Sequence, residues 1–396
     1  MPRSVVSDPA DETDEGSLVA RVLGGIDEID AATWDACAGD VDPFLSHAFL
    51  LALEESGSVT AETGWAPRHV VVESDAGEVV GVAPAYLKGH SYGEYVFDHS
   101  WAAAFERVGG DYYPKLQVAV PFTPVTGRRL LVRPGPGSEA RERAVIAALT
   151  QITDRLGLSS LHVTFATEAE WRRMGDAGLL LRTGEQFHWE NRGYGSFDDF
   201  LADLSSRKRK TIRKERQTAQ SEELSFETLT GDSLSTAHWD AFFHFYMDTG
   251  GRKWGTPYLN RAFFDLLGER LADKVVLMMV KRNGRYIAGA LNFRGKEALY
   301  GRYWGCIEDH DCLHFETCYY RAIDYAIEHG LPRVEAGAQG PHKIQRGYLP
   351  TLTYSAHWIR DEGFRRAVAQ YLDQERDHVA LETEALREEY SPFKRG

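Results

Sequence analysis

Histidine, lysine and arginine side chains crowd into one glycine-rich stretch near the C-terminal end of the sequence. Residues 335–350 read EAGAQGPHKIQRGYLP and follow the strand-like run LPRV. Its glycines let the backbone approach a ligand, and one helical turn would aim Lys343 and Arg346 at the same anion. Because ligand sites of α/β proteins lie at the carboxyl ends of strands, we expect this loop to face a substrate. A surface loop with solvated cations is the alternative.

Two further stretches combine cations with aromatic rings. GRYWG (301–305) places Arg302 beside Tyr303 and Trp304 at the end of a strand, where an arginine binds carboxylate or phosphate and a ring stacks on a ligand. The alternative is an aromatic cluster at a hairpin rim. TGGRKWGTPY (249–258) offers Lys253 and Trp254, either in a mobile lid or in a linker.

A strongly basic island stands out from an acidic chain. RKRKTIRKER (207–216) carries seven cations and one acid, whereas the net charge of the whole chain is −14. Cations near a helix C-terminus favour the helix dipole, which is the alternative explanation. Seven exceed that need, so we expect a polyanionic ligand such as a nucleotide diphosphate or an RNA end. The cations expected to bind it are Arg207, Arg209, Lys210, Arg213 and Arg216.

Weaker signals lie elsewhere. CIEDHDCLHFETC (306–318) mixes cysteine and histidine without a common zinc spacing, so buried or incidental side chains are favoured over a metal site and no metal is expected. In the first half, the pair Asp98-His99 suits a general base or a hydrogen-bonded structural role. The irregular segment 109–131 offers further polar side chains for contacts: Tyr112, Tyr113, Lys115 and Arg128.

Composition narrows the class of protein. The chain has 396 residues, of which 43% are hydrophobic and 12% aromatic, as expected of a folded enzyme with two or three domains. Its negative charge disfavours DNA binding. It lacks an apolar run of the roughly 18 residues that a membrane helix needs. Residues 1–16 read as a disordered acidic arm without a signal-peptide core, which predicts a cytoplasmic protein.

The two halves of the sequence repeat one order of elements. A helix at 42–57 precedes three strands in 67–102, and a helix at 256–271 precedes three strands in 274–305, with hairpin turns at Gly77 and Gly284. We predict an α/β fold of two similar domains with mixed sheets, at 17–185 and 186–360, and a helical tail at 361–396. A linker helix should start at Ser196, with the basic island at its C-terminal end.

The second-half motifs resemble those of a known family. YGRYWG, LHFETCYYRAIDYAIEHGL, EAGAQGPHKIQRGYLP and YSAHW are similar to the GNAT-like proteins of peptidoglycan biosynthesis or recognition, which are related to Fem-type aminoacyltransferases. The resemblance spans roughly residues 42–360 and implies two tandem GNAT-like domains. It places Lys343 and Gly347, within HKIQRGY, on positions that face substrate. The long coiled-coil insertion of many tRNA-using relatives is absent, and the GNAT phosphate loop has no clean match.

The expected activity is direct transfer of an acyl or aminoacyl group to an amine. Such chemistry needs positioning, proton removal and oxyanion stabilisation, and no enzyme nucleophile. The donor is acyl-CoA or aminoacyl-tRNA, used as a co-substrate without a bound cofactor. The acceptor is an amino sugar, a cell-wall precursor or a small peptide. A non-catalytic module that binds glycan or peptidoglycan precursors is the alternative. Catalytic roles are expected for His342, Lys343 and Glu316, and substrate contacts for Arg302, Tyr303, Trp304, Gln339, Arg346, Tyr348, Lys253 and Trp254.

Overall fold

The computed structural model describes residues 18–220, 223–253, 257–337 and 340–394. The first half of the chain begins with β1 (Val19–Leu23), α1 (Ala31–Ala38), α2 (His47–Glu55), β2 (Trp65–Pro67), β3 (His69–Glu73), β4 (Val79–Ala83) and β5 (Ala85–Lys88). It continues with α3 (His99–Arg107), β6 (Lys115–Val118), β7 (Leu131–Val132), α4 (Ser138–Arg155), β8 (Ser160–Ala166), α5 (Glu168–Asp176) and β9 (Leu180–Glu190).

The second half repeats the alternation of helices and strands. Its elements are α6 (Phe197–Asp203), α7 (Ser206–Ala219), β10 (Leu224–Leu229), α8 (Thr236–Lys253), α9 (Arg261–Arg270), β11 (Val275–Arg282), β12 (Arg285–Arg294) and β13 (Ala298–Cys306). There follow α10 (Leu313–Phe315), a π-helical turn η4 (Glu316–Tyr320), α11 (Arg321–Glu328), β14 (Arg333–Glu335), the 3-10 helix η5 (Pro341–Arg346), β15 (Leu349–Ile359) and α12 (Glu362–Tyr390).

Strands from both halves join in one mixed sheet. Among the described residues, its order is β10-β11-β12-β13-β14-β9-β15-β8-β6-β5-β2, and a smaller sheet has the order β1-β3-β4-β7. Strand β9 of the first half lies between β14 and β15, and β15 of the second half pairs with β8. The two halves therefore complete one another's sheet, and the predicted boundary at 185/186 falls inside β9. The division into domains at that residue stays a prediction.

The turn chemistry read from the sequence is present. Gly77 and Gly284 have φ angles of 76° and 80°, and Asn283 has a φ of 51°, all in the left-handed region that such hairpins use. Ser196 caps α6 by accepting a hydrogen bond from the backbone of Asp199. That helix ends at Asp203, however, and a new helix begins at Ser206. The basic island consequently starts α7, so the prediction that it lies at a helix C-terminus is wrong.

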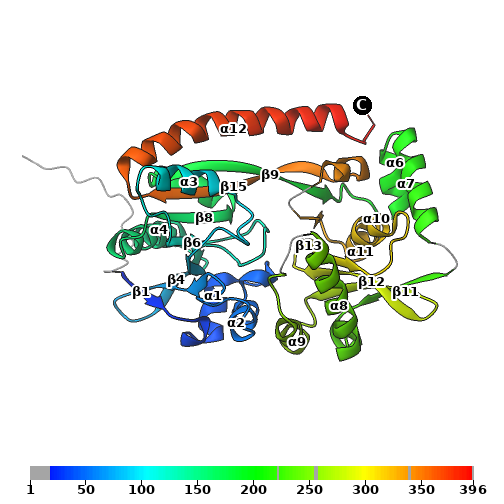
Figure 1. Cartoon of the computed structure of the whole chain (residues 1–396), viewed down its shortest axis with the longest axis horizontal. Coiled ribbons are helices and arrows are strands. Elements are labelled where there is room, and N and C mark those ends of the chain that lie inside the picture. The colour runs from blue at the N-terminus through cyan, green and yellow to red at the C-terminus, as the bar shows by residue number, and fades with distance from the viewer. Residues whose placement is uncertain (1–17, 221–222, 254–256, 338–339, 395–396) are drawn as a thin grey trace, which may run out of the picture.

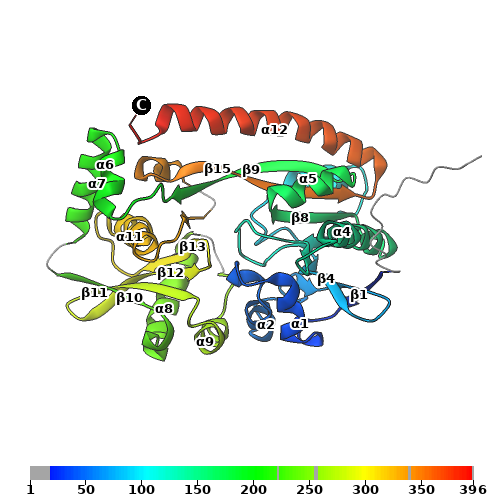
Figure 2. The same cartoon turned by 180° about the vertical axis from the view of Figure 1, so that it is seen from behind.

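A shared apolar core and the C-terminal helix hold the halves together. Phe44 and Phe49 of the first half pack on Phe293 of the second, with ring centroids 5.0 and 5.7 Å apart. Helix α12 runs along one side of the molecule over both halves, as Figure 1 shows, and Figure 2 shows β9 and β15 beneath it. It is tied to β9 where Arg182 meets Glu375 through hydrogen bonds of 2.7 and 2.8 Å. Among the described residues no helix combines the length and apolar character that crossing a membrane requires.

Candidate functional site

Strands β13 and β14 run side by side in the second half and then separate. Their parallel register covers only Ala298–Tyr300 with Arg333–Glu335, whereas β13 continues to Cys306. A bulge opposite β12 leaves Arg302 out of register. Bulges are frequent beside active sites because they re-aim side chains and interrupt pairing. We call this region the β13–β14 fork. Within the described chain, the edge of β13 past Tyr300 has no strand partner on the β14 side, so a ligand amide or carbonyl can meet it there.

A pocket of about 280 Å³ opens beside the fork. Trp304 and Cys306 of β13, Thr249 of α8 and the start of α10 line it, together with the loop 308–310. This loop carries carboxylates where the helix dipole would otherwise attract an anion. One of them, Glu308, forms an ion pair of 2.8 Å with Arg282. Arg285 lies 3.8 Å from the same carboxylate, so two cations offset the charge of Glu308.

Rings connect the pocket with the glycine-rich loop. Trp304 packs edge-on against His314, and His314 against Tyr319, with centroids 5.4 and 5.2 Å apart. Tyr319 in turn lies 6.0 Å from the ring of His342. Tyr319 and His314 were not among the residues predicted for the site, although both lie in the aromatic-rich HFETCYY. This chain of rings brings the predicted Trp304 and His342 to one side of the fork.

Lys343 is buried under the loop that it was expected to project from. Its Nζ donates hydrogen bonds to the carbonyl oxygens of Ala336 (2.6 Å) and Gly337 (3.0 Å). Burial lowers the pKa of Lys343 to about 8. The lysine therefore fixes the backbone next to the fork and holds a charge that is only weakly favoured at neutral pH. Such an amine responds strongly to a developing negative charge nearby.

His342 is the exposed neighbour of this lysine. Its Nε2 lies 3.1 Å from the hydroxyl of Tyr319. Burial of the ring, followed by the charges of Arg346 and Lys343, lowers its pKa below the usual value. The imidazole is thus neutral at pH 7, the state in which it accepts a proton.

Arg346 has a partner other than the one expected. Its guanidinium binds both oxygens of Glu215, at 2.7 and 3.2 Å, and lies 3.5 Å from the centroid of the Phe315 ring. Lys343 and Arg346 consequently face different groups, and the expectation that one helical turn aims both at one anion is wrong. Arg346 joins η5 to α7 instead.

Glu316 is fully buried in the π-helical turn. Its carboxylate accepts two hydrogen bonds of 3.1 Å from Arg216 and one of 2.8 Å from Gln220. Arg216 also binds Asp324 at 2.6 Å. These contacts give Glu316 the surroundings of a structural ion pair, and its proposed part in proton handling stays a prediction.

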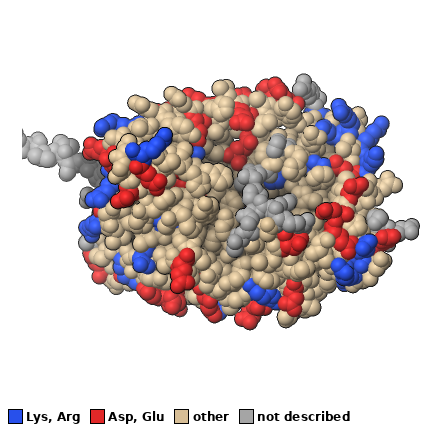
Figure 3. Space-filling view, in the orientation of Figure 1, with Lys and Arg blue, Asp and Glu red and all other residues tan. Residues whose placement is uncertain are grey.

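The other cations of α7 are turned outward. Arg207 and Lys210 are exposed and Arg209 is half-buried, and within the described chain the side chains of these three form no hydrogen bond or ion pair. Arg213 lies 3.1 Å from Asp198 at the surface. Figure 3 shows a group of basic side chains at the upper right, where α6 and α7 lie in Figure 1. Since the helix dipole disfavours cations in a first turn, this placement is not explained by helix stability.

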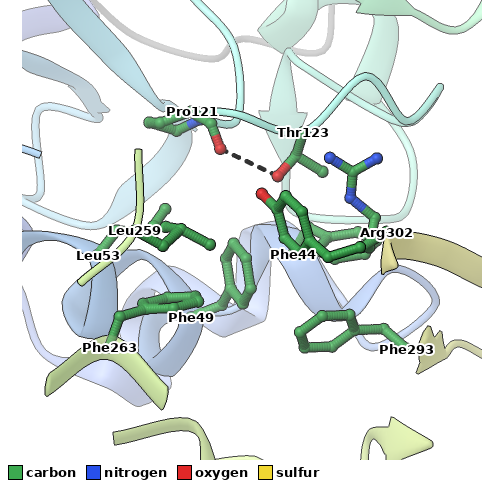
Figure 4. A pocket seen from close by; sticks show the side chains of 10 residues that line it. Phe44, Phe49, Leu53, Pro121, Thr123, Leu259, Phe263, Phe293 and Arg302 are labelled. Carbon is green, nitrogen blue, oxygen red and sulfur yellow. Dashed lines mark hydrogen bonds between the residues drawn. The ribbon is translucent and has the colours of Figure 1, made fainter. Parts of the chain in front are cut away.

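Arg302 and Tyr303 point toward the junction of the halves. The Nη2 of Arg302 donates to the carbonyl of Phe122 at 2.5 Å, and its guanidinium lies 5.3 Å from the Tyr303 ring. Both residues line a small cavity of about 10 Å³ with Phe44, Phe49 and others (Figure 4). They therefore lie on the opposite side of β13 from the Trp304 pocket.

The remaining predicted residues have mixed placements. Tyr348 is buried and donates its hydroxyl hydrogen bond to the carbonyl of Tyr319 at 3.1 Å. Gln339 and Trp254 lie outside the described residues, as does the side chain of Lys253. Among the described residues no three histidine, cysteine or acidic side chains gather as metal ligands, including those of the 306–318 stretch.

Three solved structures with a similar architecture cover most of this chain. FemX is similar over 86% of this chain and 99% of its own, with 13% identity and a TM-score of 0.54. The C-terminal domain of a putative lysylphosphatidylglycerol synthetase from Agrobacterium fabrum matches over 88% of this chain and 97% of its own, with 10% identity and a TM-score of 0.54. L-PGS from Bacillus licheniformis matches over 84% and 98%, with 11% identity and a TM-score of 0.50. No curated protein matches the chain.

These likenesses establish the fold and not the activity. The chain is an α/β protein with two tandem GNAT-like domains and mixed sheets, as the sequence predicts. Residues 25–395 match the FemAB-like family, described as peptidoglycan biosynthesis/recognition, and the chain belongs to that family.

Proposed function

We propose that this protein is an N-acyltransferase that moves an aminoacyl group to an amine acceptor at the β13–β14 fork. The observation that carries the proposal is the pairing of a buried lysine with a neutral histidine at the fork. Lys343 Nζ is held 2.6 Å from the Ala336 carbonyl, and His342 stands beside it with a lowered pKa. Membership of the peptidoglycan-related family supports the same class of reaction.

The reaction needs a base that takes a proton from the amine and a positive charge that stabilises the oxyanion. The acceptor amine attacks the carbonyl carbon of the donor ester, a C–N bond forms, and the proton leaves the amine for His342. We assign the tautomer in which Nε2 carries the hydrogen and donates it to the Tyr319 hydroxyl 3.1 Å away, which leaves Nδ1 of the imidazole as the basic atom. The charge on the carbonyl oxygen of the tetrahedral intermediate is met by the ammonium of Lys343, and the C–O bond of the donor then breaks. The leaving oxygen takes up the proton.

Charge distribution favours aminoacyl-tRNA over acyl-CoA as the donor. The outward cations of α7 suit an RNA backbone, which is bound through its phosphates. Helix α7 contacts the glycine-rich loop directly, because Lys208 donates to the side chain of Gln345 at 3.0 Å. An RNA end bound on α7 would thus lie near the fork.

The acceptor is proposed from the family alone. A peptidoglycan precursor or a small peptide with a free amine fits the family description. The name of the putative lysylphosphatidylglycerol synthetase joins an amino acid to a lipid, so a lipid acceptor belongs in the same test. Phosphatidylglycerol offers a hydroxyl in place of an amine, so transfer to it alone would overturn the amine acceptor.

A transfer assay tests the proposal. Purified protein is mixed with tRNA charged with radiolabelled amino acids, or with labelled acetyl-CoA, and with peptidoglycan precursors, peptides or phosphatidylglycerol. Label that moves from tRNA to an amine supports the proposal. Label that moves only from acetyl-CoA would overturn the choice of donor. Tight binding of precursors without any transfer would favour a non-catalytic binding module and contradict the proposed enzyme.

A further inference from the structure

The pocket of about 280 Å³ lies further along β13 than the proposed reacting centre. A Cβ atom added at Gly301 would lie 3.8 Å from the Cα atom of Ala336, and the carbonyl of Ala336 holds Lys343. Trp304 and Cys306, the β13 residues of the pocket, stand three and five residues beyond Gly301. Trp304 is therefore on the order of 10 Å along the strand from the carbonyl group that would react. Only a long side chain on that carbonyl reaches the pocket.

The pocket also shares a wall with the elements that α7 contacts. Leu313 and His314 of α10 line it, and α10 continues directly into η4. Helix α7 packs against both elements, and its Arg216 binds Glu316 of η4. A donor RNA bound on the outward cations of α7 would thus bring its aminoacyl end to the fork from the side of the pocket. This placement favours the transferred amino acid, rather than the acceptor, as the group that enters it.

One carboxylate of the pocket already has cationic partners. Glu308 lies 2.8 Å from Arg282, 3.8 Å from Arg285 and 3.3 Å from Nε2 of His310. Its negative charge is therefore offset within the protein, and it offers little attraction to a ligand.

The neighbouring carboxylate, Asp309, has no such partners. Within the described residues it forms no ion pair, and its Oδ1 accepts a weak hydrogen bond from the thiol of Cys306 at 3.9 Å. Because Cys306 is buried in the wall of the pocket, this contact turns the carboxylate of Asp309 toward the pocket. Asp309 is exposed, so a ligand can reach it. A carboxylate in this position attracts a cation.

The aromatic wall of the pocket favours the same kind of group. The rings of Trp304 and His314 meet edge to face with centroids 5.4 Å apart, and Leu313 is buried beside them. Such a wall covers a hydrocarbon stem, and the face of an indole ring attracts an ammonium or a guanidinium. The side chains of lysine and arginine combine these two properties, because a chain of methylene groups carries a charged head.

We propose that this pocket selects the amino acid that is transferred, and that it takes a long side chain ending in a cation, with the stem against Trp304 and the charge at Asp309. An extended lysine or arginine side chain covers most of the distance from the fork. A glycyl or alanyl group would leave the pocket empty, because neither has a side chain that extends past a β carbon. The inference rests on the proposed function, since it assigns the amino acid of the donor that reacts at the fork.

Binding of stable donor analogues tests the inference without requiring transfer. The probes are RNA hairpins that imitate a tRNA acceptor stem and carry lysine, norleucine, alanine or glutamate through an amide bond in place of the ester. Fluorescence anisotropy gives their affinities. Norleucine has the hydrocarbon stem of lysine without its charge. We expect the lysyl probe to bind about 5-fold or more tighter than the norleucyl probe, and the alanyl probe to bind no better than the norleucyl probe.

Two variants at one position show whether Asp309 recognises the charge. Asp309→Asn should remove the preference for the lysyl over the norleucyl probe, and Asp309→Lys should reverse it in favour of the glutamyl probe. Because Asp309 is exposed, both variants should fold as the unaltered protein does. Asp311→Asn is the matched control. It removes an exposed carboxylate that does not line the pocket, so the preference should remain.

The outcomes separate this inference from the proposed function. Equal affinity of the unaltered protein for the lysyl and norleucyl probes, or a preference that survives in Asp309→Asn, would overturn the selection of a cationic side chain, while transfer from tRNA would stand. Failure of every probe to bind would overturn the inference as well. The transfer assay then shows whether the proposed function falls with it, because label that moves only from acetyl-CoA excludes the proposed donor.

Discussion

Arg216 and Glu316 join helix α7 to the π-helical turn through two hydrogen bonds of 3.1 Å each. One hundred residues separate them in the sequence. The pair places the basic helix against the same turn that carries Tyr319, the hydrogen-bond partner of His342. The buried carboxylate of Glu316 therefore sets where the rings of the site lie.

Replacing the carboxylate of Glu316 should lower the free energy of unfolding and leave the pH dependence of the reaction unchanged. Glu316→Gln leaves the guanidinium of Arg216 with a weaker partner in a buried place, so we expect a loss of about 3–5 kcal/mol in the free energy of unfolding. Urea denaturation measures it. The pH profile of any remaining activity should keep its shape. A shifted acid limb with little loss of stability would instead identify Glu316 as a base.

The outward face of α7 should bind RNA in a salt-dependent way. Arg209→Glu with Lys210→Glu should weaken tRNA binding about 10-fold or more at low salt, and the loss should shrink as salt rises because screening already weakens the unaltered protein. Filter binding at several salt concentrations measures this. Arg172→Glu on α5, another exposed arginine, is the control. Equal affinities for all three proteins at low salt would return this helix face to the role of a solvated surface.

Local patterns predicted much of the fold, and long-range pairing explains what they missed. The hairpins at Gly77 and Gly284 and the helix over 362–390 follow from turn chemistry and periodicity. The exchange of β9 and β15 between the halves does not follow from local patterns, because the sequence of a strand does not determine which other strand it pairs with.

The candidate site shows the same limit. His342 and Trp304 were selected from residue type and position at a strand end, and the structure brings them to one side of the fork through Tyr319. The partners of Lys343 and Arg346 could not be predicted, because the sequence around a loop cation is the same whether its side chain faces solvent or binds a backbone carbonyl or Glu215.

Two histidines at the junction of the halves should make the protein sensitive to acid. The Nδ1 atoms of His162 and His357 lie 2.7 Å apart in full burial, and desolvation lowers the pKa of His162 to about 3 and that of His357 well below its usual value. A histidine with a lowered folded-state pKa binds its proton only in the unfolded chain. Stability is thus lost as pH falls below about 6.5, at about 1.4 kcal/mol per pH unit for each histidine.

Burial raises the pKa of Glu94 to about 7, so protonation of this carboxyl stabilises the folded protein as pH falls from 7 to 4.5 and opposes the loss caused by the histidines. A histidine variant therefore isolates the histidine contribution to stability. Urea unfolding at pH 7.5 and 5.5 should show a smaller loss for His357→Gln than for the unaltered protein. Equal losses for the two proteins would mean that His357 is already charged in the folded state or that the pair does not titrate.

The rate of transfer should depend on pH through both loop residues. His342 must be neutral, so kcat/KM should rise with pH through a pKa below 6.5, and Lys343 must be charged, so it should fall near pH 8. Lys343→Arg keeps its charge at any pH, and its residual activity should lack the alkaline limb. A profile that rises steadily past pH 8 would show that Lys343 acts as a neutral base.

Whether transfer takes place at the β13–β14 fork can be measured by single-turnover transfer with Lys343→Met and His342→Ala. Because Lys343 is buried on two carbonyls, its replacement should lower stability by about 1–3 kcal/mol, so thermal melting must first show a folded variant. We expect both variants to bind aminoacyl-tRNA as the unaltered protein does and to transfer the label about 100-fold or more slowly. Folded variants that transfer the label at nearly the unaltered rate would show that Lys343 and His342 do not carry the reaction and that transfer does not take place at the fork.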